Sequence, residues 1–195
     1  EVSGGQVFDV PGSERPVQCG LMTDIAYKLV DSDKEIVVST TRPETLLGDS
    51  GIAVHPEDER YKEFHGCQVW HPFREVAIPI VTDTAVDPTM GTGAVKITPG
   101  HDYNDWEMGE RHGLEVISVM DEAGCMVKCD EEFRGLGRFE AREKMIDALE
   151  EMGLLRGQRE HEMTIPVCHR TGDVLEPRLQ PQWFLRTDKM AELAC

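Results

Sequence analysis

The first segment of the chain that could do chemistry is VSTTRPETLLGDSG, at residues 38–51. It begins as a run of β-branched residues, typical of a strand, and then turns sharply at Arg-Pro. Thr40, Thr41, Arg42 and Thr45 lie around this turn. Hydroxyls can hold a substrate or a water molecule, and an arginine can bind a carboxylate or phosphate through paired hydrogen bonds. These four residues are therefore one wall of a candidate binding site.

The same turn also has a purely structural interpretation. Thr41 and Glu44 have the spacing of a capping box, in which the hydroxyl caps a helix start and the glutamate reaches back to the cap. Pro43 suits a first helical turn, and Gly48 can end the element. This interpretation leaves the other polar residues of the turn unexplained, so both alternatives stay open at this point.

The second segment with chemical potential is GTGAVKITPGHDYND, at residues 91–105. Strand alternation places Val95 and Ile97 on one face, which we expect to be core, and Lys96 with Thr98 on the other. A lysine beside a threonine suggests either a polar surface or a cleft. The segment then turns at Pro-Gly, so its last residues belong to a different element.

Two carboxylates follow that turn. Asp102 has the position of a helix N-cap, and Asp105 lies in the first turn, where the helix dipole favours acids. The alternative is that both face a substrate together with Lys96. A His-Asp pair, His101 and Asp102, also occurs in metal phosphohydrolases, but those sites are usually built on helical bundles. We therefore expect no metal here.

The cysteines give little support for a metal site or a disulfide framework. Six are scattered along the chain, which favours free thiols in a reducing compartment. Cys125, Cys129, Cys168 and His169 could be assembled into a zinc site, but the chain has no CxxC pair. We expect free thiols and no zinc.

The acidic composition limits the partners that the chain can bind by charge alone. The formal net charge is −17, with 39% hydrophobic and 29% charged residues. Affinity for a phosphate backbone comes largely from Lys and Arg, so any RNA contact must be local or shared with a neighbouring domain. No apolar run is long enough to predict a membrane span. The N-terminus resembles no signal peptide and lacks a starting methionine, so we expect a piece of a longer chain.

The order of elements predicts an α+β fold, with a curved or barrel-like mixed β-sheet core and several peripheral helices. The clearest helix is 138–153, where apolar residues recur on one face and Gly153 suits the position after the C-cap. Its predicted buried face consists of Phe139, Met145, Ile146, Leu149 and Met152. Strands are expected at 23–30, 34–41, 51–56, 67–72, 75–83, 91–99, 115–120 and 124–128, further helices at 56–66 and 101–113, and extended segments at 161–167 and 181–185.

Taken together, these sequence motifs resemble those of the editing domain of class I aminoacyl-tRNA synthetases, a large insertion in the catalytic fold of the leucyl, isoleucyl and valyl enzymes. The resemblance covers the chain from about residue 23 to 186, and the matching motifs occur in the family's order: TTRPETLLGD, AVHPEDERY, GTGAVKITPGHDYND, GERHGL and HRTGDVLEPRLQPQWF. Arg42-Pro43-Glu44 with Lys96-Ile97-Thr98 favours the valyl branch, because the leucyl pattern usually has Asp for Glu44 and the isoleucyl pattern lacks Arg-Pro-Glu. Departures from the usual pattern occur at Ser50, Gly51, Met90, Gly100 and Tyr103.

The resemblance implies a proofreading hydrolase for threonine wrongly attached to valine's tRNA, with threonyl-adenylate left open as a second substrate. A hydrophobic pocket cannot strongly reject a near-isostere that adds a hydroxyl, and threonine at a valine-activating site is the standard illustration of this limit. Asp105 is expected to hold the substrate ammonium, and the threonines at the strand end to position water. The implied catalytic residues are Thr40, Thr41, Asp102 and Asp105, and the implied substrate-binding residues are Arg42, Thr45, Lys96, Thr98 and Asp105.

The resemblance also sets expectations for organisation and partners. Residues 1–160 are predicted to form the editing core, and 161–195 an extended segment returning toward a catalytic domain. That domain would use ATP, but its HIGH and KMSKS signatures are absent here. The expected partners are the tRNA(Val) 3′ end, the threonyl moiety and the rest of a valyl synthetase, with no cofactor and no membrane. The expected location is cytoplasmic, with mitochondria left open. Two alternatives remain: a non-catalytic insertion that guides the tRNA 3′ end, and the editing domain of an isoleucyl or leucyl relative.

Overall fold

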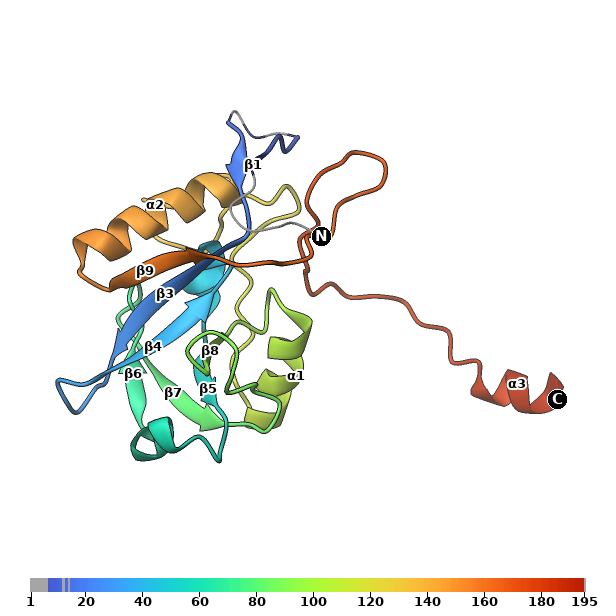
Figure 1. Ribbon diagram of the computed structural model, residues 1–195. Coiled ribbons are helices and arrows are strands. Elements are labelled where there is room, and N and C mark those ends of the chain that lie inside the picture. The colour runs from blue at the N-terminus through green and yellow to red at the C-terminus, as the bar shows by residue number, and fades with distance from the viewer. Residues whose placement is uncertain (1–6, 12, 14, 195) are drawn as a thin grey trace.

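Two main sheets form the body of the molecule in this computed structural model, which describes residues 7–11, 13 and 15–194 (Figure 1). The first sheet has the order β4-β3-β9 and is antiparallel, and the second has the order β6-β7-β5-β8. In the second, β5 runs parallel to β7, and the other pairs are antiparallel. The strands are β3 (Leu21–Lys28), β4 (Glu35–Thr40), β9 (Leu155–Glu160), β6 (Gln68–Trp70), β7 (Ala77–Thr82), β5 (Gly51–Val54) and β8 (Ala94–Ile97).

The remaining elements lie around these sheets. A two-stranded ribbon, β1 (Val7–Phe8) with β2 (Val17–Gln18), precedes the first sheet. The helices are the 3₁₀ helices η1 (Pro43–Gly48) and η2 (Glu59–Phe64), and the α-helices α1 (Tyr103–His112), α2 (Arg138–Glu151) and α3 (Asp188–Ala194). Figure 1 shows α2 lying along β9 and α1 beside β8, while the chain after β9 runs away from the body to α3.

The larger core cluster joins both sheets, η1 and α2. Ile25 and Val38 come from the first sheet, Ile52 and Ile80 from the second, and all four are buried. Leu46 of η1 is fully buried in the same cluster. Burying a side chain of this size stabilises the fold by about 1.5–3 kcal/mol. The 3₁₀ helix that follows β4 is therefore held by the core and cannot move independently of the sheets.

The α+β prediction is confirmed, and the strands predicted at 23–30 and 34–41 are present as β3 paired with β4. The described strands form separate sheets and no closed barrel. All three predicted helices are present, the one at 56–66 as the 3₁₀ helix η2. The helix α2 ends as predicted, with Gly153 at a φ of 65° after the C-cap Met152. Its buried face differs in part, because Ala141 is buried and Met152 is 41% exposed.

The strands predicted at 115–120 and 124–128 are wrong. This part of the chain has only isolated bridges, Met120 with Met126 and Cys125 with Gly137. The apolar pattern there arises because Val119, Met120 and Met126 pack into the core from an irregular loop. A strand missed by the sequence analysis, β9, is mostly polar and exposed along its length, so it lacks the alternation that marks a strand.

No helix in the described residues is long and apolar enough to cross a bilayer. After β9, residues 161–187 form no strand of a sheet and have isolated bridge positions, among them Val167 paired with Val174. This segment nevertheless contacts the body at Glu176, as described below.

Candidate functional site

A cavity of about 390 Å³ opens where β4 and β8 end. Its volume falls within the usual range for small-molecule sites. Its apolar lining is rich in methionine and includes Met22, Met90, Met108 and Met163. Its polar lining contains all eight residues proposed from the sequence: Thr40, Thr41, Arg42, Thr45, Lys96, Thr98, Asp102 and Asp105.

The turn after β4 is not built by a capping box, so that prediction is wrong. The N-cap position of η1 is Arg42, and no side chain caps the helix. The hydroxyl of Thr40 accepts a hydrogen bond from the Arg42 amide (3.0 Å), and the hydroxyl of Thr45 donates to the Arg42 carbonyl (3.0 Å). Glu44 turns into the protein instead of back to Thr41. The hydroxyl of Thr41 makes no hydrogen bond with any described residue, so it is free to contact a ligand or a water molecule.

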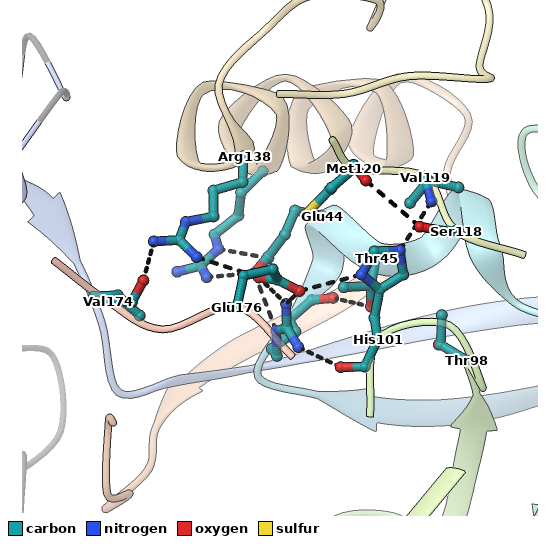
Figure 2. A network of polar contacts seen from close by, with 12 residues as sticks. Glu44, Thr45, Thr98, His101, Ser118, Val119, Met120, Arg138, Val174 and Glu176 are labelled. Atoms are coloured by element: carbon teal, nitrogen blue, oxygen red, sulfur yellow. Dashed lines mark hydrogen bonds and ion pairs between the residues drawn. The ribbon is translucent and has the colours of Figure 1, made fainter. Parts of the chain in front are cut away.

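Glu44 is buried, 1% exposed, and anchors a network of ion pairs behind the turn (Figure 2). Arg142 of α2 donates to both of its oxygens (2.8 and 2.7 Å), and Arg42 approaches it at 3.4 Å. Burial alone raises the pKa of Glu44, but Arg142 and Arg42 outweigh that effect and lower the pKa to about 2. The carboxylate is thus ionised over the physiological pH range.

Arg42 is held on several sides by protein groups. It donates to both oxygens of Glu176 at 2.5 Å, and its Nη1 donates to the backbone oxygen of His101 (2.8 Å). Glu176, from the segment after β9, also pairs with Arg138 at 3.3 Å. Arg42, which lines the cavity, therefore connects three distant parts of the chain.

Both ring nitrogens of His101 are engaged by protein groups. Its Nε2 accepts a hydrogen bond from the Val119 amide (2.9 Å), so this nitrogen carries no proton. The other nitrogen, Nδ1, then bears the proton and faces Glu176 at 3.2 Å. The side chain is 1% exposed. Both ring nitrogens are occupied, and neither can take a proton from a water molecule in the cavity.

Lys96 is also buried, 7% exposed, in a polar cluster beneath the cavity. Its ammonium donates to the hydroxyl of Thr45 (2.7 Å), to Oδ1 of Asp49 (3.1 Å) and to the hydroxyl of Thr98. Asp49 follows Gly48, is fully buried, and also accepts from the hydroxyl of Tyr27 (2.5 Å). The two segments found in the sequence are therefore joined through one ion pair, Lys96 with Asp49.

The two carboxylates after the Pro-Gly turn have different roles in the structure. Asp102 is the N-cap of α1, as predicted, and accepts from the amides of Asn104 (2.9 Å) and Asp105 (3.1 Å). Asp105 accepts from the Thr98 amide (2.9 Å) through one oxygen. Burial raises the pKa of Asp105 to about 6, against the opposing effect of Lys96. An anionic carboxylate held at the cavity, only partly compensated by its neighbours, suits a cationic ligand.

Three residues of the site were missed by the sequence analysis: Asp49, Arg142 and Glu176. Asp49 follows the glycine that ends η1, and its sequence position alone does not indicate a buried partner. Glu176 lies 134 residues from Arg42 and Arg142 lies 98 from Glu44, so no local spacing relates them. The described residues contain no group of three or more His, Cys, Asp or Glu placed to hold a metal ion. Cys125, Cys129 and Cys168 are free thiols.

Two crystal structures of leucyl enzymes share this fold. The ternary complex of Agrobacterium radiobacter K84 agnB2 LeuRS with tRNA and LeuAMS aligns with a TM-score of 0.59 at 23% identity, over 81% of this chain and 24% of that one. The structure of GlLeuRS-CP1 aligns with a TM-score of 0.57 at 12% identity, over 72% of this chain and 100% of that one. At these identities the likeness concerns the fold alone.

Sequence comparison points to the valyl branch. The human valine–tRNA ligase is 50% identical over 100% of this chain, which matches 16% of that protein. The Schizosaccharomyces pombe valine–tRNA ligase is 49% identical over 100% of the chain and 20% of its own length. A mitochondrial valine–tRNA ligase of Saccharomyces cerevisiae is 47% identical over 98% of the chain and 18% of its own length. The chain thus spans a fifth or less of these relatives.

The family comparison agrees with the resemblance noted in the sequence. The model of the family described as "Leucyl-tRNA synthetase, editing domain" matches residues 57–154, which is half of the chain. Valine–tRNA ligases match the whole of it at about 50% identity. The chain therefore belongs to the editing-domain family of class I aminoacyl-tRNA synthetases.

Proposed function

We propose that the chain is the proofreading domain of a valyl-tRNA synthetase and hydrolyses threonyl-tRNA(Val), the product of mischarging. The observation that carries this proposal is the cavity, which is lined by an anionic carboxylate, by threonine hydroxyls and by several methionines. An aminoacyl ester presents an ammonium, a side chain and a carbonyl. The carboxylate suits the ammonium, and the hydroxyls suit a side chain that can form a hydrogen bond.

Asp105 is the proposed partner of the substrate ammonium. One of its oxygens is held by the Thr98 amide (2.9 Å), which fixes the direction of the carboxylate and leaves the second oxygen for the ligand. Charge-assisted hydrogen bonds of this kind are about twice as strong as neutral ones. Asp102 supports this arrangement by capping the helix that carries Asp105. Its own second oxygen lies at the cavity edge and is a further contact for the ligand.

Hydrolysis of the ester would depend on positioning. An aminoacyl ester is already activated, so a held water molecule and a stabilised oxyanion suffice without a strong nucleophile. Thr41 has a free hydroxyl at the cavity, and the Thr40 hydroxyl keeps its proton available after accepting from the Arg42 amide. These two side chains are the proposed water-positioning groups. His101 is excluded from this role by its two occupied nitrogens.

Arg42 and Lys96 are proposed to affect the substrate indirectly, through the residues that they hold in place. All three N–H groups of Lys96 bond to protein acceptors, and Arg42 is engaged by Glu44, Glu176 and the His101 carbonyl, so their main effect is to hold the hydroxyls and the turns that line the cavity. Thr45 and Thr98 are the proposed contacts for the threonine side chain. A site built to bond a hydroxyl strongly disfavours an analogue that lacks it, because its own polar groups are then left unpaired.

Partners and location follow from this proposal. The threonyl group and the tRNA(Val) 3′ end would enter the cavity, and the rest of the synthetase would hold the tRNA, because the net charge of −17 opposes broad RNA binding. No cofactor is needed for ester hydrolysis by positioned water. A cytoplasmic enzyme is our proposal, and relatives named as mitochondrial make a mitochondrial one the alternative.

The decisive experiment compares substrates on the full-length protein. Threonyl-, valyl- and isoleucyl-tRNA(Val) are prepared, and the rate of deacylation is measured for each. We expect rapid release of threonine and slow release of the other two. Equal, background rates for all three would favour the guiding insertion without catalysis. Preference for a different amino acid would favour an isoleucyl or leucyl relative, and the same comparison with ATP consumption tests threonyl-adenylate as the second substrate.

A further inference from the structure

Asp49 lies below the cavity, fully buried, where η1 ends. Its Oδ1 accepts from the ammonium of Lys96 (3.1 Å) and from the hydroxyl of Thr98 (2.6 Å). Its Oδ2 accepts from the hydroxyl of Tyr27 (2.5 Å), and the Tyr27 side chain is fully buried. Asp49 does not line the cavity, so any effect on a ligand must pass through the residues it contacts.

The lysine has no hydrogen left for a ligand. An ammonium has three N–H donors, and the three acceptors of Lys96 are Thr45, Thr98 and Asp49. Although Lys96 is a cation at the wall of the cavity, its hydrogens point into the protein. Its function toward a ligand is therefore to occupy lone pairs of the two threonines.

The same count fixes the direction of both hydroxyls. A carboxylate can only accept, so Thr98 must give its proton to Asp49. Thr45 gives its proton to the Arg42 carbonyl (3.0 Å). Each hydroxyl also accepts from Lys96, which leaves one lone pair and no proton on each oxygen. Toward the cavity, Thr45 and Thr98 are hydrogen-bond acceptors only.

The carboxylate of Asp105 is an acceptor as well, so the three groups proposed to contact the ammonium and the side chain of the aminoacyl group are all acceptors. A ligand that fits must bring donors: an ammonium for the carboxylate and a side-chain O–H for a threonine. Threonine carries both, whereas valine carries only the first. We propose that Asp49 is the positioning residue that fixes this acceptor-only polarity and thereby selects a hydroxyl-bearing aminoacyl group. This inference rests on the proposed deacylation.

A purely stabilising ion pair is the competing explanation. It predicts that loss of Asp49 lowers stability and lowers the rates for all substrates alike. Fixed polarity predicts a change in the ratio of rates between substrates, because a free Thr98 proton and a free Lys96 N–H would force the threonine hydroxyl to turn and accept, whereas valine makes no such bond. The ratio therefore distinguishes the two explanations.

The test uses the full-length protein and the ratio of kcat/KM for threonyl-tRNA over valyl-tRNA. Asp49→Ala removes the acceptor, and Asp49→Val fills the space with apolar atoms. In whichever variant stays folded by thermal unfolding, we expect the ratio to fall about tenfold, the effect of one misplaced hydrogen bond. Tyr27→Phe keeps the bonds of Asp49 to Lys96 and Thr98, so we expect its ratio to change less than about twofold.

Asp49→Asn is the rescue variant and also serves if both apolar variants unfold. Its amide oxygen can face Lys96 and Thr98 while its NH₂ group donates to the Tyr27 oxygen, so the polarity survives and the ratio should stay within about threefold of wild type. An unchanged ratio in folded Asp49→Ala or Asp49→Val, or a ratio lost in Asp49→Asn, overturns the inference. Absence of deacylation by the wild-type protein is a different outcome and refutes the proposed function itself.

Discussion

Replacing Glu44 with glutamine is expected to destabilise the chain by about 3 kcal/mol at pH 7. Glu44 is buried beside Arg142 and Arg42, which lower its pKa from 4.5 to about 2. At about 1.4 kcal/mol per pH unit, this difference corresponds to roughly 3 kcal/mol of stability in the ionised state. Glutamine keeps the shape but leaves Arg142 without its anion, while Arg42 keeps its ion pair with Glu176. Breaking a buried pair typically costs about 3–5 kcal/mol.

The contribution of Glu44 to the free energy of unfolding depends on pH. Because the folded-state pKa is lowered, the stabilisation is complete above the unfolded-state value near 4.5 and is lost as the pH falls toward about 2. At pH 3.5, about 2 kcal/mol of the contribution should remain. The difference in unfolding free energy between wild type and Glu44→Gln should therefore shrink as the pH is lowered.

Urea unfolding of both proteins at pH 7, 5 and 3.5 measures that difference. Glu63→Gln is the matched control, since Glu63 pairs with Lys34 at the surface, where both side chains are more than half exposed. Its effect should be less than about 1 kcal/mol and should vary little with pH. A Glu44→Gln variant within about 1 kcal/mol of wild type at pH 7, or a difference that grows on acidification, would refute the reasoning.

Three further predictions concern the cavity. The deacylation rate of threonyl-tRNA should fall about tenfold from pH 7 to pH 5, because Asp105, whose pKa burial raises to about 6, must be ionised to bind the ammonium. A rate profile without an inflection near pH 6 contradicts this, and the profile of Asp105→Asn should have no such inflection. Gly91→Ala should lower stability by about 1–3 kcal/mol and raise KM, because Gly91 has a φ of +60° and its added Cβ would lie 2.6 Å from the Ser39 Cβ. The control is Gly66→Ala, in which the new Cβ meets open space at a φ of +73°. A larger decrease in melting temperature for Gly66→Ala than for Gly91→Ala would contradict the steric cause. His101→Asn should cost about 1–3 kcal/mol in unfolding measurements because the Val119 amide loses its acceptor, while the deacylation rate changes less than about tenfold; a near-complete loss of rate in the folded variant would restore His101 as a base.

The local elements of the site could be predicted from the sequence. A β-branched run ending at Arg-Pro and an alternating run ending at Pro-Gly marked the ends of β4 and β8, and the N-cap spacing of Asp102 marked α1. The strand β5, which follows η1 in the chain, pairs with β8. The ends of β4 and β8 therefore meet at one cavity. Hydrophobic periodicity could not show that the two segments form one site, and the resemblance to the family indicated it.

The long-range polar contacts could not be predicted from the sequence. Arg42 looked like a ligand-binding cation, yet Glu176 and the His101 carbonyl occupy it, and nothing in the local pattern indicates a partner 134 residues away. Lys96 was placed correctly at the cavity, but its three acceptors were visible only in the structure. The loop around Met120 imitates strand periodicity because its apolar side chains fill the core without a ladder of hydrogen bonds.

In the proposed reaction, this cavity hydrolyses the threonyl ester and Asp105 binds the substrate ammonium. The most direct test is the deacylation rate of threonyl-tRNA(Val) by full-length Asp105→Ala, with Glu110→Ala as the control, since Glu110 is an exposed acid on the same helix outside the cavity. Loss of a charged partner of this kind predicts a decrease in kcat/KM of at least about thirtyfold for Asp105→Ala and none for Glu110→Ala. An Asp105→Ala protein that clears threonyl-tRNA at the wild-type rate would contradict the account.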